Sequence, residues 1–533
     1  MLNKDLLEPF AGSQLLKRNP SSLNLRRNRL WMVCTLLLLL VGSPNRLFHH
    51  FIGALLGLAP LFYGVDGRPW RQQIKTAGGI WFLFCLFVFW TDFFSVKVLS
   101  WAEIVGGIVV APLLPLFYIA ATLLSLNLTR ALPPFLRPLG IASVWTALDG
   151  ILNLIWFPIP FHWGSLLYDW TVGIQIADVT GIWGVTFVSV LINATLMGVG
   201  QQWWQSRSLH RPNPNLWGCL GIGLVVSGWV IGYGLIRLPA YQNLTQDSYQ
   251  VAAVQMVGWL EPDRRWQYRE QRYLELQGLS RLGIARGAQL VVWPEGALRA
   301  RFLNTTLQPY ILDPLFEVLP PEGGLILGAT EPDPKTQDLP DEQVKFINAA
   351  LLFRQQGNFL DQYGKQWIFP YFETARYVPS AEGYRPLNGG STLGQLGVMI
   401  CLESVLPSPS RRLVQRGAES LIVISDDSWF GNSNWPKLHG NLSIFRAIEN
   451  RRSITFVNNT GGNLIVDPSG EIQAAGTIFE QDVVVGQVFL GQEITFYTQL
   501  GDWFSYLCIT ILLGLVGSRW SHFYQTRLSH RSN

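Results

Sequence analysis

The sequence predicts a membrane protein built from a bundle of about eight spanning helices and a separate α/β domain outside the cytoplasm. Of the 533 residues, 49% are hydrophobic and only 14% are charged, whereas soluble proteins carry about 25% charged residues. The apolar residues are concentrated in residues 30–236 and 499–518. Residues 249–490 have the composition of an ordinary soluble domain and are long enough for one large core or a single sandwich.

Eight segments are read as spanning helices, since a helix that crosses a bilayer needs about 20 mostly apolar residues. The first segment is short and runs into Ser43 and Pro44, so it is a broken helix or one arm of a helical hairpin with the second. It lacks a small-residue cleavage pattern and further spans follow it, which argues against a signal peptide. The eight segments are residues 30–43, 48–65, 79–95, 103–126, 140–157, 179–199, 216–236 and 499–518.

The charges of the loops predict how the spans are oriented, because loops rich in Lys and Arg stay in the cytoplasm. Such residues gather in both terminal tails and in every second loop, whereas the alternate loops carry little beyond Arg46 and Lys97. Seven crossings then precede residue 249, which puts the soluble domain outside. The predicted parts are a cytoplasmic tail (1–29), a seven-span bundle (30–236), the soluble domain (249–490), a last span (499–518) and a second cytoplasmic tail (519–533).

The soluble domain shows strands and helices that alternate early and hairpins that come late, which indicates a mixed α/β layered fold. Three strand ends carry the stretches WPEGA, CLESV and SDDSWFG, and chemistry often collects at strand ends in such sheets. Strands are expected at 250–256, just before Pro294, at 323–330, at 346–353, up to Cys401, at 420–427 and twice within 453–472, with helices at 266–287 and 409–417.

Cys401 is the only cysteine of the soluble domain and therefore has no disulfide partner there. The other four cysteines fall in predicted spans, where packing is the expected role. Proteins outside the cytoplasm mostly pair their cysteines, so this thiol is either an inert core residue or a residue in use. The spanning cysteines are Cys34, Cys85, Cys219 and Cys508.

A thiol nucleophile needs a base for its proton and a cation for the charge that develops. His439 is the only histidine of the soluble domain and has no obvious partner in the sequence, so we expect a surface or structural residue. Glu295 follows a strand and a proline, where it is either a base of raised pKa or a solvated turn residue. Lys365 lies among aromatic residues, either desolvated near a reacting group or snorkelling at the surface.

The motifs WPEGA around Glu295, YGKQWIFPYFE around Lys365 and GVMICLES around Cys401 resemble those of the nitrilase superfamily, which uses a Glu–Lys–Cys triad in an α/β/β/α sandwich. With the eight spans, the chain resembles the apolipoprotein N-acyltransferases over nearly its whole length. The resemblance implies an enzyme of bacterial lipoprotein maturation in the inner membrane, with its catalytic domain on the periplasmic side. Residues 176–193, 425–431 and 446–461 also resemble segments of this family.

The resemblance also implies roles for individual residues. Cys401 attacks the sn-1 acyl ester of a phospholipid and forms a thioester, with Glu295 as the general base. Lys365 stabilises the tetrahedral intermediate together with the backbone N–H of Leu402, and the acyl chain then passes to the amino group of a diacylglyceryl-cysteine apolipoprotein. No cofactor and no metal are implied. Further family positions are matched by the carboxylates Glu373 and Glu403 and by the lipid-contacting aromatics Trp163 and Trp266.

Two residues depart from the family pattern, namely Leu402, where an aromatic is common, and Asp426, where an asparagine is usual. Both departures concern acyl-chain or headgroup preference rather than the chemistry. One alternative is a membrane-anchored carbon–nitrogen hydrolase of a soluble substrate, which would not need eight spans. The other is a transporter or receptor without enzyme activity, disfavoured because only Asp149 stands mid-span, with Asp178 at an edge. A net charge of +4 without a basic aromatic stripe argues against nucleic acid.

Overall fold

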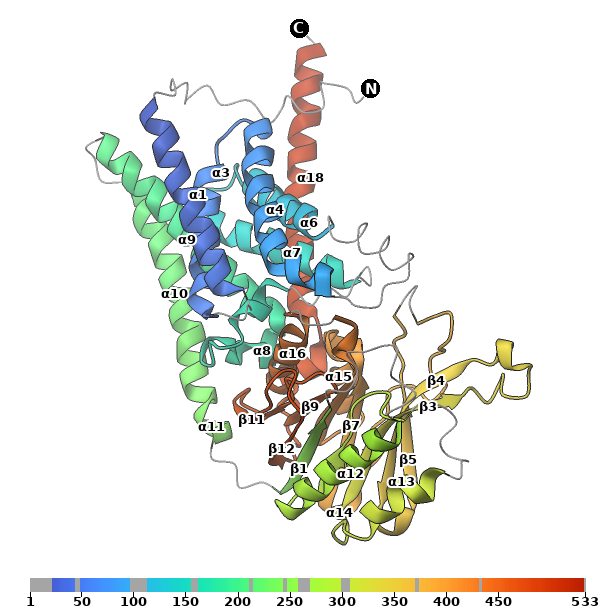
Figure 1. Cartoon of the computed structure of the whole chain (residues 1–533). Coiled ribbons are helices and arrows are strands. Elements are labelled where there is room, and N and C mark those ends of the chain that lie inside the picture. The colour runs from blue at the N-terminus through green and yellow to red at the C-terminus, as the bar shows by residue number, and fades with distance from the viewer. Residues whose placement is uncertain are drawn as a thin grey trace.

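The molecule has a helical bundle at one end and a sandwich of two β-sheets at the other, as the computed structural model in Figure 1 shows. The last helix, α18 (Trp503–Arg531), leaves the sandwich and runs along the bundle. The structure describes residues 22–43, 48–95, 113–154, 162–209, 214–242, 247–256, 269–298, 307–369, 373–430 and 434–531.

The bundle packs around α7 (Arg137–Leu154), which contacts α6, α9 and α18. Its core contains an aromatic cluster in which the rings of Trp81, Tyr118, Trp145 and Trp163 meet at centroid distances of 4.5 to 6.4 Å. The other helices are α1 (Ser22–Gly42), α2 (Phe51–Leu56), α3 (Leu58–Val65), α4 (Trp70–Ser95), α6 (Leu113–Leu128), α8 (Ala177–Thr180), α9 (Ile182–Leu209), α10 (Pro214–Arg237) and α11 (Pro239–Gln242).

The predicted count of eight spans is not confirmed. Among the described residues, three helices are long and apolar enough to cross a membrane, at Ile182–Arg207, Pro214–Tyr241 and Trp503–His522. Shorter apolar helices cover Leu30–Gly42, Phe51–Val65 and Leu113–Leu128. The predicted segments 103–126 and 140–157 extend outside the described residues.

The first two predicted spans form a hairpin, which was one of the two alternatives. Helices α1 and α2 approach each other at Gly42 and Gly53, and a Cβ atom on Gly53 would lie only 2.1 Å from the Gly42 nitrogen. The chain turns back where the N–H of His50 donates to the carbonyl of Val41 at 2.9 Å. Glycine is therefore required at the contact because any side chain would push the two backbones apart.

The sandwich consists of two six-stranded mixed sheets, in the orders β12-β1-β2-β3-β4-β5 and β11-β10-β9-β8-β7-β6. Its central strands are parallel (β1, β2 and β3; β7, β8 and β9), and its edge strands are antiparallel. The strands are β1 (Ser248–Gln255), β2 (Leu290–Val292), β3 (Gly324–Pro332), β4 (Phe346–Arg354), β5 (Phe359–Gly364), β6 (Leu387–Asn388), β7 (Gln395–Ile400), β8 (Ser420–Ser425), β9 (Ile454–Asn458), β10 (Leu464–Val466), β11 (Ile472–Ala475) and β12 (Asp482–Phe489).

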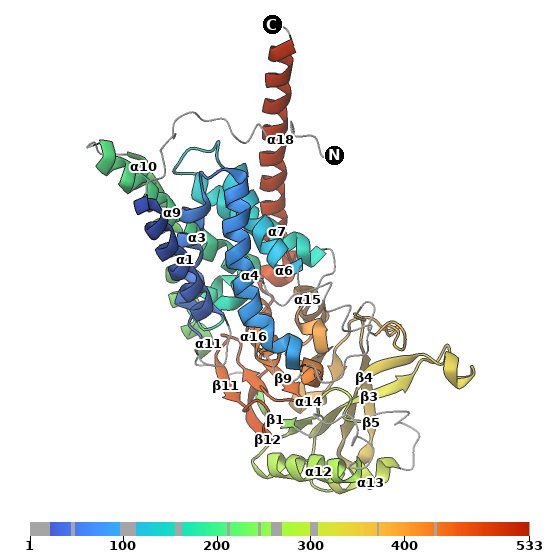
Figure 2. The same cartoon turned by 45° about the horizontal axis from the view of Figure 1, so that its top comes forward.

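Helices cover both outer faces of the sandwich, so the expected α/β/β/α layering is present. Figures 1 and 2 show α12 (Arg269–Ala285) and α13 (Leu307–Phe316) on the side away from the bundle. On the other face, α15 (Pro407–Gln415) and α16 (Trp435–Asn450) lie between the second sheet and the bundle. Strands β8 and β9 are buried along their whole length, as expected for parallel strands covered on both faces. The short helices α14 (Gly390–Leu393) and α17 (Phe496–Leu500) complete the fold.

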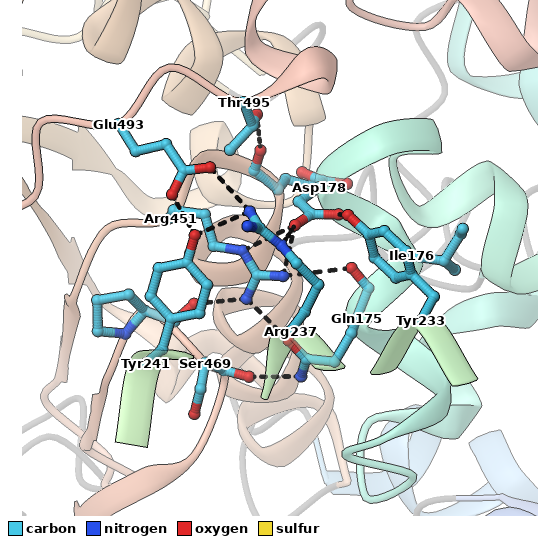
Figure 3. Close-up of polar contacts among 12 residues, drawn as sticks. Gln175, Ile176, Asp178, Tyr233, Arg237, Tyr241, Arg451, Ser469, Glu493 and Thr495 are labelled. Atoms are coloured by element: carbon cyan, nitrogen blue, oxygen red, sulfur yellow. Dashed lines mark hydrogen bonds and ion pairs between the residues drawn. The ribbon is translucent and has the colours of Figure 1, made fainter. Parts of the chain in front are cut away.

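A buried network of charged groups, the junction cluster, joins the sandwich to the bundle (Figure 3). Arg451, at the end of α16, donates to Asp178 of α8 at 2.6 Å and to the side-chain oxygen of Gln175 at 2.8 Å. Arg237 of α10 reaches the same Asp178 oxygen at 3.1 Å and binds Glu493 at 2.8 Å. Arg451 and Asp178 are almost fully buried, so the sandwich has a defined position against the bundle.

Candidate active site

The three triad residues predicted from the sequence stand at the ends of three strands. Glu295 comes three residues after β2 and Lys365 directly after β5, both in the first sheet. Cys401 directly follows β7 of the second sheet. The site therefore lies where the ends of the two sheets face each other, and it depends on both sheets being in place.

Glu295 is buried and held in one orientation by two hydrogen bonds. The side chain of Asn348 donates to its Oε1 at 2.5 Å, and the backbone N–H of Asp426 donates to its Oε2 at 2.9 Å. Burial raises the pKa of Glu295 to about 7, against the opposing charge of Lys365 and with support from the nearby carboxylates Glu373 and Asp426. A carboxylate with this pKa accepts and returns a proton readily near neutral pH.

Lys365 is a buried cation between two carboxylates. Its Nζ donates to Glu373 Oε1 at 2.6 Å and lies 4.0 Å from Glu295 Oε1. Burial acts to lower the pKa of Lys365, but interactions with Cys401, Glu295 and Glu373 outweigh this effect and raise the pKa above its usual value. The side chain therefore stays an ammonium group, fixed in place and able to hold a developing negative charge.

Glu403 joins the turn after β5 to the turn after β7. It is fully buried, and its carboxylate accepts hydrogen bonds from the backbone N–H groups of Ile400, Gln366 and Trp367 at 2.8 to 3.0 Å. The hydroxyl of Tyr363 donates to it as well, at 3.1 Å. Burial raises the pKa of Glu403, whereas the backbone donors lower it. Glu403 thus fixes the distance between the segments that carry Lys365 and Cys401.

Cys401 has a positive φ of 55°, a conformation that is strained for any residue but glycine. It opens the short 3₁₀ helix Cys401–Ser404, in which the Ser404 hydroxyl donates to the Cys401 carbonyl at 3.0 Å. Burial, with the charges of Glu295, Asp427 and Glu373, raises the pKa of the thiol, and Lys365 opposes this. The thiol is therefore favoured over the thiolate, and a base has to remove its proton before the sulfur can act as a nucleophile.

The backbone N–H of Leu402 completes the surroundings of the thiol. It belongs to the first turn of the 3₁₀ helix, where amide groups have no acceptor within the helix. The Leu402 side chain is buried and packs in the main apolar core. The Leu402 N–H thus lies at the start of this turn, one residue after the thiol.

Two residues around the nucleophile were not predicted to take part, His439 and Asp427. His439 is fully buried in α16, so the expectation of a surface residue is wrong. Its Nδ1 lies 3.0 Å from Asp427 Oδ1, and its Nε2 lies 3.2 Å from the Cys401 carbonyl oxygen. Asp427 belongs to the stretch SDDSWFG at a predicted strand end. This position was the signal in the sequence that could have identified Asp427 as a neighbour of the site.

The two aromatic residues proposed as lipid contacts are not brought to the triad among the described residues. Trp163 lies in the bundle core with only 1% of its surface exposed. Its indole N–H donates to Ser189 at 3.0 Å and its backbone N–H to Asp149 at 3.1 Å, so a lipid contact of this ring stays a prediction. Trp266 lies outside the described residues. Among the residues that are described, no group of three or more His, Cys, Asp or Glu side chains could hold a metal ion.

Two family descriptions match the chain, one for each part of the molecule. Residues 250–495 match the carbon–nitrogen hydrolases, and residues 35–195 match the N-terminal domain of apolipoprotein N-acyltransferases. A carbon–nitrogen hydrolase structure from Helicobacter pylori G27 is 17% identical and covers 45% of this chain and 89% of its own, with a TM-score of 0.36.

Relatives align over most of the chain. The apolipoprotein N-acyltransferase of Geobacter metallireducens is 29% identical over 372 residues, which is 66% of this chain and 68% of the relative. That of Azotobacter vinelandii is 28% identical over 480 residues, 84% of this chain and 87% of its own. Apolipoprotein N-acyltransferase 2 of Treponema denticola is 25% identical and covers 89% of this chain and 94% of its own.

These findings exclude the non-enzymatic alternative, because one match covers the bundle and the other covers the sandwich with its Glu295, Lys365 and Cys401 cluster. The chain belongs to the apolipoprotein N-acyltransferase family, whose catalytic domain is of the nitrilase superfamily and whose activity is the N-acylation of lipoproteins.

Proposed function

We propose that the protein moves an acyl chain from a membrane phospholipid to the N-terminal amino group of a diacylglyceryl-cysteine apolipoprotein, through a thioester on Cys401. The observation that carries this proposal is the cluster of buried charges at the strand ends. Lys365 Nζ lies 4.0 Å from Glu295 and interacts electrostatically with Cys401. A base, a cation and a thiol in one buried site are the groups that acyl transfer needs.

In the first half of the reaction, Glu295 removes the proton of the Cys401 thiol as the sulfur attacks the ester carbonyl carbon. The negative charge that develops on the carbonyl oxygen is stabilised by Lys365 Nζ and by the N–H of Leu402. Collapse of this intermediate breaks the carbon–oxygen bond of the ester. The departing lysophospholipid oxygen takes the proton from Glu295, and the acyl chain remains on sulfur.

In the second half, the amino group of the apolipoprotein attacks the thioester carbonyl carbon. Glu295 takes a proton from the attacking nitrogen, and the same donors hold the oxyanion. The carbon–sulfur bond then breaks, the amide forms, and the proton on Glu295 returns to the Cys401 sulfur. Because the same base works in both directions, a pKa of about 7 suits it.

A site next to the bundle suits the acyl donor, because the chain can enter without crossing water. Exposing about 16 carbons to water would cost about 0.8 kcal/mol per CH₂ group, or roughly 13 kcal/mol in total. The side chain of Asn434 donates to the carbonyl of Val88 in α4 at 3.3 Å, so the segment after the SDDSWFG stretch touches the bundle. The loop charges support a position of the sandwich on the periplasmic side.

Cys401→Ala tests the proposal directly. After incubation with phosphatidylethanolamine in detergent, we expect intact-protein mass spectrometry to find one added acyl chain on the wild type and none on the variant. N-acylation of a diacylated lipopeptide should be lost in parallel. Cys34→Ala is the matched control, because Cys34 is exposed on α1, and it should retain both activities.

The proposal would be wrong if Cys401→Ala still acylated the lipopeptide. The carbon–nitrogen hydrolase alternative makes a different prediction, namely that water is the acceptor. Release of free fatty acid or ammonia at the same rate with and without the lipopeptide would favour it. Under the transferase proposal, the lipopeptide should speed the disappearance of the acyl-enzyme.

A further inference from the structure

Next to the backbone of Cys401 lies a buried histidine–aspartate pair that the reaction scheme does not use. His439 and Asp427 are both completely buried. Asp427 is fixed by the side chains of Asn458, at 2.6 Å, and Ser425, at 3.0 Å. The imidazole packs edge-on against Phe456 with 5.0 Å between the ring centroids, so the ring has one orientation.

Both nitrogens of this imidazole face groups that accept hydrogen bonds. Nδ1 faces the Asp427 carboxylate at 3.0 Å, and Nε2 faces the Cys401 carbonyl oxygen at 3.2 Å. The Ser404 hydroxyl lies 2.8 Å from Nε2 and itself donates to the same carbonyl. Asp427 accepts from Nδ1 and so orients the ring, and an N–H on Nε2 is then aimed at the Cys401 carbonyl oxygen.

The carbonyl that receives this hydrogen bond belongs to the peptide group whose other end is the N–H of Leu402. A donor bound to the oxygen of a peptide group withdraws electron density and makes its N–H a stronger donor in turn. In a trans peptide the two ends point in opposite directions. The imidazole therefore acts from the interior on an N–H that points away from it.

We propose that His439, held by Asp427, is a positioning residue that strengthens the Leu402 N–H as a donor to the oxyanion through the Cys401–Leu402 peptide group. The inference rests on the proposed thioester mechanism and on the role of Leu402 in it. His439 touches neither substrate nor the reacting sulfur. It acts through the backbone of the nucleophile, and the same hydrogen bond supports the strained turn at Cys401.

Two amide substitutions distinguish the contact made by Nε2 of the imidazole from the contact made by Nδ1. The amide of Gln in His439→Gln reaches the position of Nε2 and can still donate to the Cys401 carbonyl. The shorter amide of Asn in His439→Asn reaches only the position of Nδ1, so it contacts Asp427 and leaves the carbonyl without this donor. The pair is matched in polarity and in the loss of the ring, and it differs in the hydrogen bond that the proposal invokes.

Two rate constants are to be measured on each full-length variant in detergent. The first is the formation of acyl-Cys401 from phosphatidylethanolamine without acceptor, followed by quenching and mass spectrometry. The second is alkylation of Cys401 by iodoacetamide, a direct displacement at carbon that forms no oxyanion. Alkylation thus reports the placement of the thiol, whereas acylation also reports the oxyanion site.

We expect His439→Asn to lower the acylation rate constant about tenfold, since complete removal of an oxyanion donor costs about 10²- to 10³-fold. His439→Gln should stay within about threefold of the wild type, and both variants should be alkylated within about twofold of it. The apparent KM for phospholipid should not change. Asp427→Asn, which removes the carboxylate charge but keeps an acceptor for Nδ1, should lower acylation too, whereas alkylation should not fall, because a charge that raises the pKa of the thiol is removed.

Equal losses in acylation and alkylation would overturn the inference, because the imidazole would then merely place the thiol. Unchanged acylation in His439→Asn, or in Asp427→Asn should the histidine variants not fold, would overturn it too. These outcomes differ from failure of the proposed function, in which the wild type itself would acquire no acyl chain on Cys401.

Discussion

Glu295 is the residue of the candidate triad whose protonation changes near neutral pH. Its pKa is raised to about 7 because it is buried among the carboxylates Glu373 and Asp426, whereas the ammonium of Lys365 is held charged well beyond this range. A base works only in its ionised form. The rate of acyl-enzyme formation should therefore follow the ionisation of Glu295 alone on the acidic side.

We expect the rate constant of acyl-Cys401 formation to fall about tenfold between pH 8 and pH 6, because protonation removes the base. Asp426→Asn should move this acidic limb to lower pH, since a like charge that raises the pKa of Glu295 is removed. The measurement is single-turnover acylation across pH. Ser428→Ala is the control, because it loses a hydrogen bond to Asp426 but no charge. If the acidic limb of the Ser428→Ala profile moved as far as that of Asp426→Asn, the electrostatic explanation would be contradicted.

The sequence predicted the triad only when its motifs were taken together. Reasoning from the residues alone left Glu295 between a base and a turn residue, and Lys365 between a desolvated and a surface lysine. The structure shows both side chains buried and within 4.0 Å of each other. His439 was not recognised as a neighbour of Cys401 because 38 residues separate them in the chain, and only the packing of α16 against the second sheet brings them together.

Among the elements, the strands with strong apolar runs were predicted well. The runs at 250–256, 323–330, 346–353 and 420–427 correspond to β1, β3, β4 and β8. Helix α16 escaped prediction because its residues are buried on all sides, so no polar face produces a helical period. Strand β5 escaped because its first half is exposed, and the stretch at 453–472 holds two strands as expected, with β11 beginning at its end.

The α1–α2 hairpin offers a test at the level of elements. A Cβ atom on Gly53 would meet backbone atoms of Gly42 and Leu38, and such overpacking costs about 1–3 kcal/mol. We therefore expect Gly53→Ala to lower the thermal unfolding midpoint in detergent. Gly79 of α4 has nothing within 4 Å of its Cβ position, so Gly79→Ala should leave the midpoint unchanged or raise it slightly. Equal effects of the two substitutions would argue against the tight contact.

In the molecule as a whole, the junction cluster fixes the sandwich against the bundle. Asp178→Asn leaves the fully buried guanidinium of Arg451 without its carboxylate, and breaking a buried pair costs about 3–5 kcal/mol. Glu493→Gln is the control, since Glu493 is 46% exposed at its side chain and such pairs contribute about 0–1 kcal/mol. Thermal unfolding in detergent should show a large loss for the first variant and a small one for the second. Similar midpoints would mean that the two parts are held together elsewhere.

The division of the triad between two sheets has one more consequence. Glu295 and Lys365 belong to the first sheet and Cys401 to the second, so no single layer holds a competent set of reacting groups. Shear of one layer across the other, even with every strand intact, would separate donor from acceptor of the proton. The reaction therefore depends on how the two layers are aligned. On heating, turnover should vanish as soon as the layers slip, before any helix or strand is lost.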